Sequence, residues 1–169
     1  MRPGTTSWPS PPLGLTPVAL PYCDNLTVWG TDELRVNGLL QSLLEAFQKL
    51  GFDLHEITWA TQHHETLGRA FLGDAHCIRP RPERVWTLRG ALRAVASGEK
   101  VTGKTLEKLM GHYVVEALDQ REALSVPRAV YTFIKDSYWT SQRVWESVAR
   151  ELYVCAGFLP LIKGDFGRP

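Results

Sequence analysis

Two stretches of the sequence contain residue types that could bind metal ions or phosphate groups. The first is Tyr22-Cys23-Asp24-Asn25, where an apolar run leads into a short acidic and polar pair and resumes directly after it. Asp and Asn tolerate a left-handed backbone and hydrogen-bond their own main chain, so the pattern predicts a tight hairpin. Because a carboxylate at the tip of a rigid hairpin is a good metal ligand, Asp24 is the candidate metal ligand.

The second stretch is residues 98–105, Gly-Glu-Lys-Val-Thr-Gly-Lys-Thr, a full match to the phosphate-binding Gly-x-x-x-x-Gly-Lys-Thr loop. Such a loop needs a buried strand before it, so that its N–H groups converge on the phosphate at a helix N-terminus. Residues 86–96 instead show helical spacing with Ala and Arg. We therefore expect a helix-loop-helix turn here, and a P-loop NTPase acting through Gly98–Thr105 stays an alternative function.

Other candidate ligands are histidines and cysteines. His63, His64, His76 and Cys77 could form a zinc site, but their spacing matches no standard finger, and adjacent histidines on a strand cannot easily face one ion. The three cysteines are odd in number and unpatterned, which argues against a disulfide framework and for a reducing compartment.

The elements around the first motif can be predicted from periodicity. Thr31 or Asp32 can cap a long amphipathic helix that ends at Leu50, with Gly51 as its stop. Residues 52–59 and 70–78 have the composition of short strands, which we expect to extend the sheet begun by the hairpin. The run Arg79-Pro80-Arg81-Pro82 should then interrupt regular structure.

From Glu83 onward the apolar spacing is helical. Four stripes, within residues 85–95, 106–117, 129–134 and 144–153, predict four helices, and we expect their aromatic residues to pack in the core. Residues 159–163 are predicted to begin another strand. The fold class is therefore α+β, with a small antiparallel sheet followed by a helical segment.

Tyr22-Cys23-Asp24-Asn25 in this setting resembles the Tyr-x-Asp-Asp hairpin of the reverse-transcriptase palm. After it come the long helix closed by Gly51-Phe52, then Leu54-His55-Glu56, and then the Phe-Leu-Gly run within residues 67–73, an order similar to that of retroelement polymerases. The later stretches Val101-Thr102-Gly103, Leu106-Glu107, Gly111-His112 and Leu159-Pro160-Leu161 look like the region between palm and ribonuclease-H-like domain.

Residues 1–16 are rich in Pro, Gly, Ser and Thr, which predicts a disordered lead. For the rest of the chain the resemblance implies three segments and a set of roles. The segments are the C-terminal part of the palm (17–79), a helical thumb and connection (83–158), and the start of a ribonuclease-H-like segment (159–169). Asp24 and Asn25 would be catalytic, Tyr22 would pack under the primer end, and Cys23 would lie near the incoming nucleotide. The implied partner is a primer–template or RNA–DNA hybrid.

This sequence departs at two places from the metal-binding pattern that the resemblance implies. Polymerases hold two Mg²⁺ ions with several converging carboxylates. Asn25 offers only a neutral carbonyl oxygen at the second hairpin position, and residues 1–23 contain no Asp or Glu. We therefore expect Mg²⁺ to bind weakly or not at all, and this chain alone not to polymerise DNA.

The charge is unevenly distributed although the formal net charge is only +1. Residues 79–108 contain eight Lys or Arg against three Glu, a balance of +5, whereas residues 18–77 contain three bases against eight acids, a balance of −5. This asymmetry favours a nucleic-acid-facing segment beside an acidic one. The predicted nucleic-acid-binding residues are Arg84, Arg89, Arg93, Lys100, Lys104 and Lys108. A solvated helix face explains the same charges, so a non-catalytic helical module that binds nucleic acid or protein is a second alternative.

No secretory signal follows Met1, and no stretch approaches the roughly 18 consecutive apolar residues of a membrane span. We expect an intracellular protein, cytoplasmic or nuclear, without a membrane partner.

Overall fold

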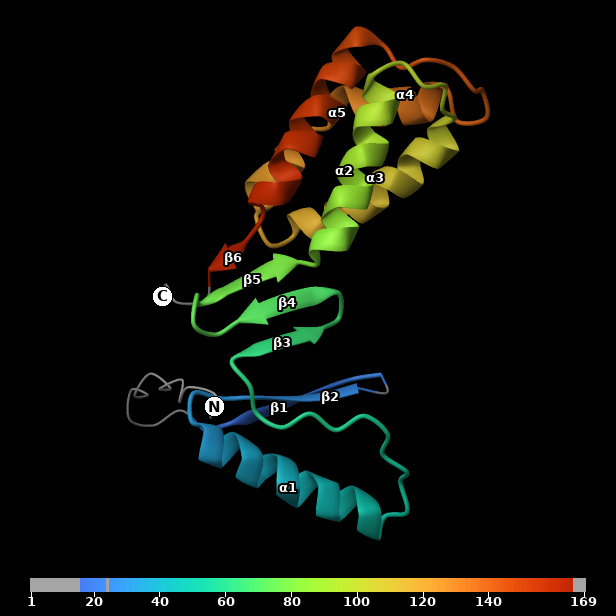
Figure 1. Ribbon diagram of the computed structural model, residues 1–169. Coiled ribbons are helices and arrows are strands. Elements are labelled where there is room, and N and C mark those ends of the chain that lie inside the picture. The colour runs from blue at the N-terminus through green and yellow to red at the C-terminus, as the bar shows by residue number, and fades with distance from the viewer. Residues whose placement is uncertain (1–15, 24, 166–169) are drawn as a thin grey trace, which may run out of the picture. The chain divides into compact units, whose positions relative to one another are not determined.

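The computed structural model describes residues 16–23 and 25–165. The chain divides into two compact units, residues 1–61 and residues 62–169. Each unit combines antiparallel strands with helices, which confirms the predicted α+β class (Figure 1). Within the described ranges, no helix has the length and apolarity that crossing a membrane would require. The division between units does not coincide with the palm–thumb boundary expected near residues 79–83.

The first unit begins with the predicted hairpin. Strands β1 (Val18–Tyr22) and β2 (Asn25–Trp29) pair antiparallel, from Val18 opposite Trp29 to Tyr22 opposite Asn25. Cys23, directly after β1, has a φ of 51°, the left-handed geometry that tight hairpin connections use. Asp24 lies outside the described residues.

Helix α1 (Glu33–Lys49) follows with both of its predicted ends. Asp32 is the N-cap, and its Oδ1 accepts the Arg35 N–H at 3.1 Å. At the other end Gly51 has a φ of +78°, and the N–H groups of Gly51 and Phe52 donate to Gln48 O and Phe47 O at 3.0 Å each. These two bonds form a Schellman motif, which explains why the helix stops here.

The strand predicted over residues 52–59 is wrong. Residues 52–61 contain no strand. The Phe52 ring packs edge-on against Phe47 with centroids 5.7 Å apart, so the segment starts by closing the end of α1 instead of pairing with β1 or β2. The segment is also held to the helix at its far end, where the Ala60 N–H donates to Asn37 Oδ1 at 2.9 Å.

The second unit contains a four-stranded antiparallel sheet in the order β3-β4-β5-β6. Its strands are β3 (His63–Thr66), β4 (Arg69–Leu72), β5 (Cys77–Pro80) and β6 (Gly164–Asp165). Leu67 and Gly68 connect β3 to β4 with φ values of 51° and 76°, which is the geometry of a type I′ hairpin turn. This sheet is not hydrogen-bonded to β1 and β2, so the predicted single sheet is wrong.

Two predicted boundaries in this unit also change. The strand expected over residues 70–78 is two strands, because the chain turns between Leu72 and Cys77, with His76 at a φ of 47°. The expected break at residues 79–82 shrinks to Arg81, since β5 runs through Pro80 and α2 begins at Pro82. Proline is compatible with a first helical turn because that N–H needs no partner within the helix.

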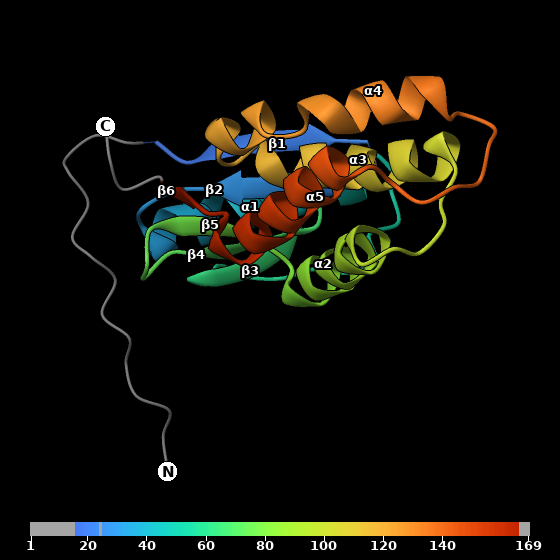
Figure 2. The same ribbon diagram turned by 90° about the horizontal axis from the view of Figure 1, so that it is seen from above.

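Four helices form the core of the second unit, as the four stripes predicted. They are α2 (Pro82–Ala96), α3 (Gly103–Ala117), α4 (Arg128–Asp136) and α5 (Glu146–Phe158), with a 3-10 turn η1 (Arg121–Ser125) between α3 and α4. Each helix contributes a fully buried side chain: Leu92, Leu106, Phe133 and Leu152. Helices α2 and α5 lie side by side in both views (Figure 1 and Figure 2).

The strand predicted over residues 159–163 is wrong. A second 3-10 turn, η2 (Leu159–Leu161), occupies these positions, and the strand β6 comes only afterwards. Residues three apart in a 3-10 turn lie on the same side, which lets both Leu159 and Ile162 enter the core. The chain then returns to the sheet, where β6 pairs with Cys77 and Ile78 of β5.

Candidate functional site

The hairpin tip presents the predicted polymerase motif at the closed end of a two-stranded ribbon. Tyr22 and Asn25 face each other as the last pair of the ladder, and Tyr22 and Cys23 are exposed. Asp24, the predicted metal ligand, falls outside the described residues. The hairpin therefore places Tyr22, Cys23 and Asn25 together, as the sequence predicted.

The donor set of this hairpin does not fit a pair of Mg²⁺ ions. Asn25 supplies a neutral oxygen where a second carboxylate is needed, and the acids that follow, Asp32 and Glu33, belong to the start of α1. Asp32 is already engaged as the helix N-cap. Among residues 16–23 and 25–165, no group of three or more His, Cys, Asp or Glu side chains could hold a metal ion.

The residues of the proposed zinc alternative are spread over the sheet of the second unit. His63 is in β3 and Cys77 in β5, and Leu72 of β4 pairs with both. His63 Nε2 lies 2.8 Å from Asp74 Oδ1, and this hydrogen bond lowers the pKa of the Asp74 carboxyl. His63 thus has a carboxylate partner in the turn between β4 and β5.

Two of the three thiols are buried. Cys77 and Cys155 are buried, and burial raises the pKa of the Cys155 thiol to about 11. A buried thiol with a raised pKa stays protonated at neutral pH and is a poor nucleophile.

Residues 98–105 adopt the predicted helix-loop-helix turn and not a phosphate cradle. Helix α2, not a strand, leads into the loop, and two backbone donors at the start of α3 are already used. The N–H of Gly103 donates to Ser137 O at 2.8 Å, and that of Lys104 to Tyr138 O at 3.0 Å. The Lys104 Nζ lies 4.9 Å from the centroid of the Trp139 ring. The groups that would hold a phosphate therefore bind the segment after α4.

We expect ATP with Mg²⁺ to leave the melting temperature unchanged, because this loop should not bind nucleotide. A ligand that did bind the native state would raise the melting temperature by mass action. Differential scanning fluorimetry with and without nucleotide measures this, and the Lys104→Ala variant is the control. A rise in melting temperature that disappears in Lys104→Ala would establish nucleotide binding by the loop.

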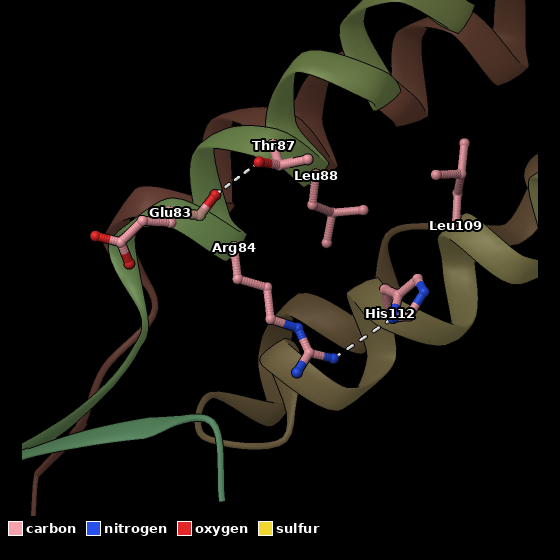
Figure 3. Close-up of a pocket in the computed structure, with 6 residues that line it drawn as sticks. All are labelled: Glu83, Arg84, Thr87, Leu88, Leu109 and His112. Atoms are coloured by element: carbon pink, nitrogen blue, oxygen red, sulfur yellow. Dashed lines mark hydrogen bonds between the residues drawn. The ribbon is translucent and has the colours of Figure 1, made fainter. Parts of the chain in front are cut away.

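A groove of about 340 Å³ lies between α2 and α3, and Figure 3 shows the residues that line it. Its polar groups bond to one another: Arg84 Nη2 lies 3.4 Å from His112 Nδ1, and Thr87 Oγ1 donates to Glu83 O at 2.8 Å. The remaining lining comes from Leu88 and Leu109. A ligand site needs polar groups that converge on the ligand. The polar groups of this groove instead hydrogen-bond to one another and stabilise the fold.

A buried ionic cluster lies beside this groove. The Glu116 side chain is 0% exposed and accepts a hydrogen bond from Arg69 Nη1, and Arg84 Nε approaches its other oxygen at 2.7 Å without hydrogen-bond alignment. Arg69 Nε lies 3.0 Å from Asp119 Oδ2. Burial raises the pKa of Asp119, and the Arg69 charge opposes this. The cluster joins β4, α2 and α3, so we assign Arg84 a structural role instead of nucleic-acid binding.

The other predicted nucleic-acid-binding residues separate into two groups. Arg89 and Arg93 lie on α2 next to aromatic rings: the Arg89 Cζ is 5.2 Å from the Trp86 ring centroid and the Arg93 Cζ is 6.0 Å from that of Tyr153. Lys100 precedes α3, and Lys104 and Lys108 lie one turn apart in it; all three are exposed. The basic segment is therefore not one continuous surface.

Trp86 and Tyr153 correct the expectation that the aromatic residues of the helical stripes are core residues. That expectation holds for Tyr113 and Phe133, which are 0% exposed, but Trp86 is 56% and Tyr153 44% exposed. The signal was present in the sequence for Trp86, because positions 86, 89 and 93 are spaced by three and four residues and share one helix face. Tyr153 lies beside these α2 residues because α5 packs against α2.

Neither the protein-family models nor the curated proteins nor the solved structures compared with this chain match it.

Proposed function

We propose that this chain is part of an RNA-directed DNA polymerase of a retroelement, from the palm hairpin onward into the thumb and connection region. The observation that supports it is the order of elements around the motif. The β1–β2 hairpin bearing Tyr22-Cys23-Asp24-Asn25 is followed by α1, by a strand ending in Phe71-Leu72 before Gly73, and by a helical bundle. This is the order that the resemblance to reverse transcriptases implies.

The proposal assigns roles to the hairpin residues that do not depend on a bound metal. Tyr22 supports the primer end, Cys23 lies beside the incoming nucleotide, and Asp24 with Asn25 faces the reacting groups. Residues 17–79 then correspond to palm, residues 83–158 to thumb and connection, and residues 159–169 to the start of a ribonuclease-H-like segment.

We expect no primer extension by the 169-residue chain on an RNA template with Mg²⁺ or Mn²⁺. Residues 1–23 contain no carboxylate and Asn25 is neutral, so the charge needed to hold two metal ions is missing. Extension assays with a labelled primer measure this. Robust extension that Asp24→Ala abolishes would refute the expected inactivity while supporting the family.

The family itself is tested by adding the coding sequence upstream of Met1. If the proposal holds, that sequence encodes an acidic palm strand, and the lengthened chain extends a primer in a manner that Asp24→Ala abolishes. An Asn25→Asp variant should raise the activity further, since it restores a carboxylate at the second hairpin position. A lengthened chain that lacks an acidic strand and stays inactive in both forms would contradict the proposal.

We also expect the chain to bind an RNA–DNA hybrid with an affinity that falls as salt rises, because phosphate contacts release counterions. Titrations at two salt concentrations measure the slope. The Arg89→Glu/Arg93→Glu variant should bind at least about tenfold more weakly, whereas the double reversal Arg128→Glu/Lys135→Glu on α4 is the control for net charge. A salt-independent interaction, or none, would contradict a nucleic-acid-binding thumb.

A second candidate function is a non-catalytic nucleic-acid-binding module. The arginines of α2 beside the exposed rings of Trp86 and Tyr153 favour it, since they require no metal chemistry. Activity of the lengthened chain separates the two proposals, because only the polymerase predicts it.

A further inference from the structure

We propose that the exposed face shared by α2 and α5 binds single-stranded nucleic acid, with Trp86 and Tyr153 stacking on bases and Arg89, Arg93 and Arg150 contacting phosphates. The inference does not depend on the polymerase assignment, because binding of an oligonucleotide requires neither the hairpin nor a metal ion.

The first observation is a row of side chains along α2. Trp86, Arg89, Arg93 and Ser97 are spaced by three, four and four residues, which places them on one helix face over about 16 Å of axis. Gly90 lies within this row, and a β-carbon there would meet nothing within 4 Å. The surface between Trp86 and Arg93 is therefore open to a ligand.

The second observation is that the rings are held in place. Tyr153 OH lies 2.8 Å from Ser97 Oγ, which ties the α5 ring to the end of the α2 row, and Arg93 lies over that ring. Arg89 lies over Trp86. Trp86 nevertheless remains 56% exposed and Tyr153 44% exposed. Aromatic rings that are fixed but accessible can stack on bases with little loss of side-chain entropy.

The third observation is the charge of the face. Arg150 of α5 adds a third arginine to Arg89 and Arg93. Its side chain is 75% exposed, and its Nη2 lies 3.1 Å from Glu146 Oε1. Glu151, the other acid of α5, points away from this face, because it accepts the N–H groups of Ala129 and Val130 at the start of α4. Glu146 lies seven residues before Tyr153 and shares its side of α5, so the face holds three arginines against this exposed carboxylate and keeps a positive balance.

The combination favours single strands over the other macromolecules that could bind here. Arginines interleaved with accessible rings are typical of single-strand sites, where every base offers a π-face, whereas a duplex hides its base faces in the stack. Trp, Tyr and Arg are also enriched in protein interfaces, so the binding of an oligonucleotide is the result that separates a single strand from a protein partner.

The test is fluorescence anisotropy with a labelled oligothymidylate of about 12 nucleotides, a length within the range of known single-strand sites. Trp86→Leu should weaken binding about tenfold, because it keeps an apolar side chain and removes the stacking ring. Trp86→Phe should restore most of the affinity. Tyr153→Leu should act like Trp86→Leu, and Tyr153→Phe, which keeps the ring but loses its hydrogen bond to Ser97 Oγ, should restore most of the affinity.

The matched control is Trp139→Leu, which removes an exposed tryptophan that lies over Lys104 instead of on this face, and it should leave the affinity unchanged. Melting temperatures of all variants report whether the fold is kept. Equal affinities for the parent chain and Trp86→Leu, or no binding of the oligonucleotide, would overturn the proposal. The chain could also bind an RNA–DNA hybrid with an affinity that Trp86→Leu does not change, and bind no single strand. That result would overturn this proposal and leave the polymerase proposal standing.

Discussion

Replacing Glu116 with alanine should lower the free energy of unfolding by about 3–5 kcal/mol, the cost of removing one partner of a buried ion pair. Glu116 is 0% exposed and lies between Arg69 and Arg84. Without its carboxylate, Arg69, whose side chain is only 13% exposed, keeps a largely desolvated charge beside Asp119. Chemical denaturation followed by circular dichroism measures the loss.

Two further variants show whether charge or packing is responsible. Glu116→Gln keeps the shape of the side chain and removes the charge, so it should lose most of the same stability. Glu146→Gln removes the carboxylate of an exposed pair on α5, where the side chain is 91% exposed, and should change stability little. If Glu116→Ala and Glu146→Gln unfold at the same denaturant concentration, the buried cluster does not stabilise the fold.

Replacing Gly103 with alanine should lower the free energy of unfolding by about 2–4 kcal/mol, from overpacking and from weakened backbone hydrogen bonds. A β-carbon at Gly103 would overlap the carbonyl oxygen of Ile134 and lie 2.8 Å from the Cα of Tyr138. The segment after α4 would have to move, and the bonds from Gly103 N–H and Lys104 N–H to it would lengthen. Denaturation curves of the variant measure the loss.

Gly111 in the same helix is the matched control. A β-carbon there would meet nothing within 4 Å, so Gly111→Ala should stabilise the helix by about 0.5–1 kcal/mol through its better helix propensity. Opposite signs for the two substitutions are therefore expected. If the two substitutions change the free energy of unfolding equally, the close approach to the segment after α4 does not explain why glycine is needed at position 103.

This requirement gives the match to the phosphate-binding loop a physical reason within the fold. Gly103 permits the close contact with the segment after α4, Lys104 lies over Trp139, and Thr102 caps α3 by accepting the Thr105 N–H at 3.2 Å. The residues of the motif are thus used for packing and capping. An unchanged melting temperature with ATP would agree with this assignment.

The local elements of this protein could be predicted from the sequence because short-range physics decides them. The β1–β2 hairpin follows from alternating apolar residues around a turn-forming pair, and α1 follows from its apolar spacing between the Asp32 cap and the Gly51 stop. The four helices of the second unit follow from their apolar stripes. Hydrogen bonds within a helix or a two-residue hairpin join residues that are close in sequence, so the pattern contains the information.

Only the tertiary structure decided which segments pair and which charges remain available. Residues 52–59 have strand composition but form no strand, because a strand also needs a partner, and Phe52 packs on Phe47 instead. Arg84 and Arg89 look equivalent in sequence, yet Glu116 holds Arg84 at the ionic cluster while Arg89 lies by the exposed Trp86. These outcomes depend on contacts between residues far apart in the chain, which hydrophobic periodicity does not specify.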